Sequence, residues 1–130
     1  MGMSALVTKD SLTYYLTDGT VLDRPIAWEI SLHTDAPGYE GLDNEVDDVD
    51  YVRQAITFVL DETDPERPFV ENTALIEFPE AVVDYTVTHI VVWDSLGNIQ
   101  TIQSLREPKI ILATEQAQIA AGEIKVGVVS

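Results

Sequence analysis

Apolar and polar residues alternate along most of the chain after residue 25, which is the period expected of half-buried β-strands. In residues 26–33, the positions on the apolar side are Ile26, Trp28, Ile30 and Leu32. Similar runs occupy residues 51–60, 73–78, 86–93, 99–105, 109–114, 116–120 and 123–129. The pattern therefore predicts about eight short strands.

Turn signals separate these runs, and no long helical pattern lies between them. Pro37-Gly38, Phe78-Pro79 and Ala121-Gly122 favour chain reversals or strand ends. Because parallel βαβ architecture needs a helix between most strands, the sequence predicts an all-β fold, an antiparallel β-sandwich or jelly roll. The expected core residues are Trp28, Ile30, Leu32, Ile56, Phe58, Ile76, Phe78, Ile90 and Val92.

The first 22 residues form a separate N-terminal arm in this interpretation, and residues 23–130 form the β-sandwich domain. Residues 8–17 can make a short helix that ends at Asp18-Gly19. The arm carries more apolar residues than a free tail would, and we expect its candidate interface to comprise Leu6, Val7, Leu12, Tyr15 and Leu16. These side chains would pack either on a neighbouring subunit or on the arm's own domain.

Net charge limits the classes of partner. The chain has 23 acidic and 7 basic residues, a formal net charge of −16, so it would repel nucleic acid and anionic membranes. The charge either keeps the surface soluble or complements a basic neighbour or a cation. The absence of cysteine fits assembly in a reducing compartment. Met1–Val7 has no signal-peptide pattern and no apolar run is long enough to span a membrane, so a soluble protein is expected.

No candidate catalytic or metal-binding residue stands in the spacing of a known motif. The acidic segment 43–50 could offer oxygen ligands to Ca²⁺ but lacks the glycine and glutamate spacing of an EF-hand loop, so a solvated loop is expected. His33 and His89 fall in predicted strands, where hydrogen-bonded and partly buried imidazoles are typical. Ser31, His33 and Asp35 share a strand face without making a triad. We therefore expect no catalytic, cofactor-binding or metal-binding residue.

Several short phrases occur in a fixed order along the chain. They are Ile30–Gly38 (ISLHTDAPG), Asn44-Glu45-Val46, Tyr51–Ala55 (YVRQA), Asn72-Thr73-Ala74, Ile76–Pro79 (IEFP), Val87-Thr88-His89 and Pro108-Lys109. Together they resemble a family of small tailed-bacteriophage virion proteins usually labelled "phage tail fibre protein". The resemblance spans most of residues 26–129. Residues 47–50 stand where that family usually has glycines, and Val52 replaces a small residue.

The resemblance implies a non-enzymatic virion structural protein that acts by packing against other virion proteins. It would be a capsid decoration (cement) subunit, or a small tail-fibre or baseplate subunit, assembled in the host cytoplasm into a closed homo-oligomer, most simply a trimer. One rival is a carbohydrate- or receptor-binding β-module at the tail tip, which would expose aromatic side chains on loops. The other is a glycoside hydrolase, which would need two paired carboxylates in a cleft.

Overall fold

A computed structural model describes residues 27–127 as nine β-strands. The strands are β1 (Trp28–His33), β2 (Gln54–Ala55), β3 (Phe58–Asp61), β4 (Phe69–Asn72), β5 (Ile76–Glu80), β6 (Tyr85–Asp94), β7 (Ile99–Ile111), β8 (Gln116–Ile119) and β9 (Lys125–Gly127). All strand pairs are antiparallel, so the predicted all-β antiparallel fold is confirmed. The predicted helix over residues 8–17 lies outside the described residues. No helix within residues 27–127 is long and apolar enough to cross a bilayer.

The largest sheet has the strand order β2-β1-β6-β7. Its centre is the pairing of β1 with β6, in which Ile30 lies opposite Val92 and Leu32 opposite Ile90. These four side chains share one face of the sheet because directly opposed residues point the same way. The other face carries Ser31 opposite Val91 and His33 opposite His89.

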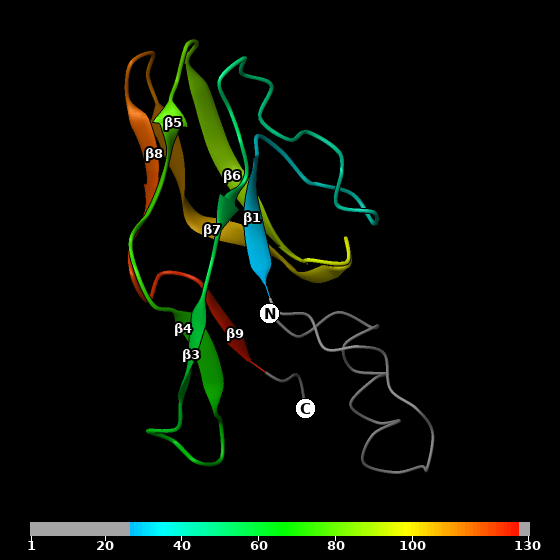
Figure 1. The fold of residues 1–130 in the computed structure, drawn as a ribbon, viewed down its shortest axis with the longest axis vertical. Coiled ribbons are helices and arrows are strands. Elements are labelled where there is room, and N and C mark those ends of the chain that lie inside the picture. The colour runs from blue at the N-terminus through cyan, green and yellow to red at the C-terminus, as the bar shows by residue number, and fades with distance from the viewer. Residues whose placement is uncertain (1–26, 128–130) are drawn as a thin grey trace.

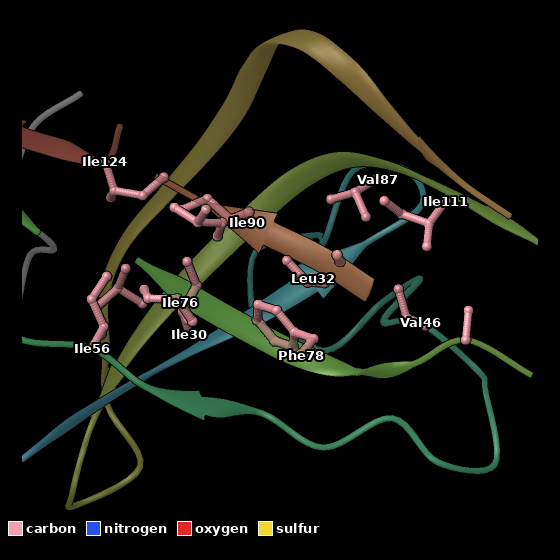
Figure 2. Packing of buried hydrophobic residues seen from close by; sticks show 14 residues of the cluster. Ile30, Leu32, Val46, Ile56, Ile76, Phe78, Val87, Ile90, Ile111 and Ile124 are labelled. Carbon is pink, nitrogen blue, oxygen red and sulfur yellow. The ribbon is translucent and has the colours of Figure 1, made fainter. Parts of the chain in front are cut away.

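The sheet formed by β5 and β8 packs over the apolar face of this large sheet (Figure 1). Figure 2 shows Ile76 and Phe78 of β5 pointing toward Ile30 and Leu32 of β1, with Ile90 behind them. Seven of the nine predicted core residues are buried, namely Ile30, Leu32, Ile56, Ile76, Phe78, Ile90 and Val92. Trp28 and Phe58 are half-buried and pack against the margin of this core.

A third sheet, in the order β3-β4-β9, extends from the lower end of the molecule (Figure 1). Asn72, which is 1% exposed, joins this sheet to the core. Its side-chain nitrogen donates to the carbonyl oxygens of Ala74 (3.1 Å) and Ala120 (2.9 Å), and its side-chain oxygen accepts from the N–H of Ile124 (2.9 Å). Each polar atom of this buried amide therefore has a partner, as burial requires.

The strand bounds differ from the prediction in three places. The predicted strand 51–60 is two strands, β2 and β3, because the chain leaves the large sheet between them. The N–H of Ile56 still donates to the carbonyl of Trp28 in the large sheet, whereas the carbonyl of Thr57 accepts from the N–H of Thr73. Strand β4 was not predicted. The two segments 99–105 and 109–114 are largely one strand, β7, whose pairing with β6 is shifted by irregularities.

Candidate functional site

The loop of residues 34–53 pairs with the end of β1 that β2 leaves free, at Leu32 and His33, and covers the polar face of the large sheet. The N–H of Val46 donates to the carbonyl of Leu32 (2.9 Å), and Glu45 forms an isolated bridge with His33. Val46 is 5% exposed and belongs to the core. Gly41, at φ 71°, lies directly against the Trp93 ring. The prediction that segment 43–50 is a solvated loop is therefore wrong in part, because Val46 and Asp48 are buried.

Beneath this loop, three side chains form a directional chain of hydrogen bonds. Nδ1 of His33 lies 2.7 Å from the carbonyl oxygen of Asp43. Because a carbonyl can only accept, Nδ1 carries the proton and donates it to this oxygen. Nε2 of His33 then accepts from the hydroxyl of Ser31 (2.8 Å), and that hydroxyl oxygen accepts from Nε1–H of Trp93 (2.9 Å). A neutral imidazole satisfies every one of these contacts.

The hydrogen bond between Ser31 and His33 is the one that a catalytic Ser-His dyad makes, but the pair is buried and has no carboxylate partner among the described residues. Ser31 and His33 have no exposed surface, and Asp35 lies apart from them, accepting from the N–H of Ala36. Burial lowers the pKa of His33, and this effect outweighs the opposing effects of the Asp43 carbonyl and Glu45. The pair therefore anchors the loop to the sheet. His89 is half-buried and bonded to Thr88, as expected of a strand histidine.

Arg53 holds the far end of the same loop. Its guanidinium makes two bonds to the Glu45 carboxylate (2.9 and 2.8 Å) and one to Glu29 (3.2 Å), and it stacks 4.5 Å from the centre of the Trp93 ring. Burial raises the pKa of Glu45, but the bonds from Arg53 and Tyr51 outweigh it and hold the pKa below its usual value. The Arg53–Glu45 pair is therefore charged and fixed in position.

Tyr51 completes this cluster. Its hydroxyl donates to Glu45 (2.7 Å) and accepts from the N–H of Leu32 (3.0 Å), and its ring stacks on Phe78. Burial raises the pKa of this hydroxyl. Tyr51 thus connects the polar cluster on the loop to the apolar core.

Asp48 ties the loop to the turn between β5 and β6. Its carboxylate accepts from the N–H groups of Val82 (2.8 Å), Val83 (3.0 Å) and Asp50 (3.0 Å). These bonds, with that of Val83 the strongest contributor, lower the pKa of Asp48. Within residues 27–127, no group of three or more histidines or acids is placed to hold a metal ion.

Apolar side chains reach the surface at both ends of the described domain. At one end of the molecule, the turns after β5 and β7 and the loop beside them expose Val49, Val82, Val83 and Leu112. At the other end, one face of the β3-β4-β9 sheet carries an apolar row that we call the open face, formed by Phe58, Leu60, Val70 and Val126. The predicted interface residues Leu6, Val7, Leu12, Tyr15 and Leu16 lie outside the described residues.

The contacts described above involve the phrases that gave the sequence its resemblance to phage fibre proteins. A family model described as Podophage GP4 fiber I protein gp80 matches residues 2–127 of the chain. The chain belongs to this family. No curated protein matches it. As a member of a phage fibre family, the protein is a component of the virion.

Membership in the gp80 fibre family gives the recurring phrases a physical meaning in this chain. His33, Glu45 and Arg53 meet around Trp93, although they come from three separate phrases. Asn72 opens a fourth phrase and joins two sheets. The phrases themselves do not predict these contacts, because most of the partners are backbone atoms or side chains from another phrase.

Proposed function

We propose that this protein is a non-catalytic structural subunit of the phage tail fibre, which acts by packing against other virion proteins. In this proposal residues 23–130 form the β-domain, and residues 1–22 form the arm that attaches it to a neighbouring subunit. The match of the gp80 fibre family to residues 2–127 carries the proposal, since it covers both the arm and the domain.

The use of polar side chains in the domain supports a structural role. The most heavily hydrogen-bonded side chains, among them Asp48, Arg53 and Asn72, bind other parts of the same chain. Each therefore contributes to rigidity. A fibre subunit transmits load through its contacts, and such a role needs a rigid body with exposed joining surfaces.

We also propose that the subunit forms a closed homo-oligomer, most simply a trimer. Strands β3 and β9 are both edges of their sheet, and β7 is a 13-residue edge of the large sheet. Exposed edges of this kind favour pairing with another chain, and closed symmetry limits that pairing to a defined number of copies. Native mass spectrometry of the purified full-length chain should give one oligomer larger than a monomer; monomer alone at high concentration would contradict this part.

The test of the fibre assignment is the position of the protein in the particle. Electron microscopy of intact virions with an antibody against the protein should label the tail, whereas label spread over the capsid would favour a decoration subunit. Virions assembled with a chain lacking residues 1–22 should lose the label. Normal occupancy without the arm would contradict the proposed attachment.

Lack of catalysis is tested separately. Purified protein incubated with host surface polysaccharide should release no reducing sugar. Release that disappears when a single acidic residue is replaced would overturn the structural assignment, because it would identify a catalytic carboxylate.

A further inference from the structure

The open face of the β3-β4-β9 sheet continues the hydrophobic core beyond the layer that covers it. Phe58 packs against the core, and the next residue on the same face of β3, Leu60, is 55% exposed. Leu60 lies opposite Val70, which in turn lies opposite Val126. The three side chains therefore form one apolar row across three strands.

The opposite face of the same sheet is mixed, since the charged residues Asp61, Glu71 and Lys125 stand there beside Val59 and Phe69, so the open face is the more apolar of the two. On the mixed face Glu71 lies opposite Lys125, whose ammonium also lies 5.1 Å from the centre of the Phe69 ring. Within residues 27–127, the three strands pack mainly against one another, and no second sheet covers the row. The open face thus lacks the layer that β5 and β8 supply elsewhere.

Charge restricts what can cover this face. Residues 27–127 contain 20 of the 23 acidic residues but only 5 of the 7 basic ones. A second copy of the domain laid on the open face would bring like charges together over that whole face, whereas the proposed oligomer forms along strand edges. A nearly neutral apolar segment would meet no such repulsion.

Residues 1–22 have this composition. They contain three charged residues, Lys9, Asp10 and Asp18, and the apolar positions identified above. The described chain also begins beside the open sheet: β1 starts at Trp28, whose carbonyl accepts from the N–H of Ile56, two residues before β3. At about 3.3 Å per extended residue, 26 residues can reach the open face of the same copy or of a neighbouring copy.

We infer that residues 1–22 dock on the open face, with Leu12, Tyr15 and Leu16 against Leu60, Val70 and Val126. The inference goes beyond the proposed function, because it assigns a receiving surface to a segment whose attachment was proposed without one. The docked arm supplies the missing apolar layer of the third sheet.

Strand β3 offers a matched pair of variants for the test. Leu60 and Val59 are neighbours with similar exposure, 55% and 50%, but they point to opposite faces. Leu60→Asp places a charge on the open face, and Val59→Asp places the same charge on the opposite face. Hydrogen exchange of the full-length protein, read by mass spectrometry, reports the protection of amides in residues 1–22.

The arm of the unmodified protein should be protected, and its exchange should become at least about tenfold faster in Leu60→Asp but stay within about twofold in Val59→Asp. Peptides from β6 should exchange at unchanged rates in both variants, which shows that the main fold is intact. An unprotected arm in the unmodified protein, or equal effects of the two variants, would overturn the inference.

A second measurement does not depend on tolerance of a buried charge. A photoreactive phenylalanine analogue in place of Leu60 should cross-link to a peptide from residues 1–22, and the mass of the product tells whether the arm comes from the same chain or from another copy. Either origin supports docking. Cross-links only to residues 27–127 of another copy would overturn it, while the loss of virion attachment on arm deletion tests the proposed function independently.

Discussion

The large sheet and the β3-β4-β9 sheet each place a row of apolar side chains on one face, yet only the large sheet is covered on both faces. Strands β5 and β8 cover its apolar face, and loop 34–53 covers its polar face through Gly41, Asp43 and Arg53. The third sheet has an apolar row with no such layer within residues 27–127. The comparison shows that strand pairing can line up apolar side chains on one face of a sheet. That face stabilises the fold only when a second layer packs against it.

The largest difference in the free energy of unfolding should come from replacing one phenylalanine in each region. Phe78 of β5 is 1% exposed and stacks on Tyr51, whereas Phe69 of β4 is half-buried on the face of the third sheet opposite the open face. Phe78→Ala should lower the free energy of unfolding by about 3–5 kcal/mol and Phe69→Ala by about 1–2 kcal/mol. Urea unfolding measures both, and equal losses would mean that the third sheet is as well covered as the first.

The junction between the two regions should be the next most sensitive point. Asn72→Ala removes the partners of the Ile124 N–H and of the carbonyls of Ala74 and Ala120. We expect a loss of about 2–3 kcal/mol, because buried polar groups without partners carry a desolvation cost. The exposed Gln118→Ala should change the free energy of unfolding by less than about 0.5 kcal/mol in the same assay. Similar values for the two would show that the junction contributes little.

The packing of loop 34–53 on the polar face of the large sheet can be tested by substitutions at two glycines. Gly41 and Gly97 have similar φ angles, 71° and 84°, so an alanine at either position should cost about 1 kcal/mol. A methyl at Gly41 would also lie 3.1 Å from the Trp93 ring, which Ser31 and Arg53 hold in place, whereas Gly97 has open space. Thermal unfolding should therefore show Gly41→Ala to be the more destabilised, by about a further 0.5–1 kcal/mol. A larger loss for Gly97→Ala would contradict the close packing of the loop.

The smallest expected effect is a pH dependence of this cover. Burial lowers the pKa of His33 below 6.5, so just below pH 6.5 the unfolded chain binds more protons than the folded protein. The free energy of unfolding therefore falls as the pH drops below about 6.5. Glu45, Arg53 and His89 face this imidazole. Urea unfolding at about pH 7.5 and about pH 5.5 should show a larger loss for the natural chain than for His33→Gln. Equal losses would mean that His33 does not carry this dependence.

The sequence by itself determined the local geometry of the β-domain. The alternation of Ile30 and Leu32 with Ser31 and His33 predicted which side chains share a face, and most of the predicted core is buried as expected. The recurring phrases also indicated the fibre family, which the match over residues 2–127 confirms. These properties follow from the two-residue period of a strand and from short turn signals, which are written in neighbouring residues.

Only the tertiary structure decided what covers each face and where strands begin and end. Asp48 accepts bonds from Val82 and Val83, more than 30 residues away, and these contacts turn part of an apparently solvated acidic segment into a buried cover. The run 51–60 is split because Ile56 and Thr57 pair with different parts of the chain. Side-chain periodicity tells which way a residue points but carries no information about the distant segment that it meets, and that meeting determines burial, charge pairing and the use of each polar group.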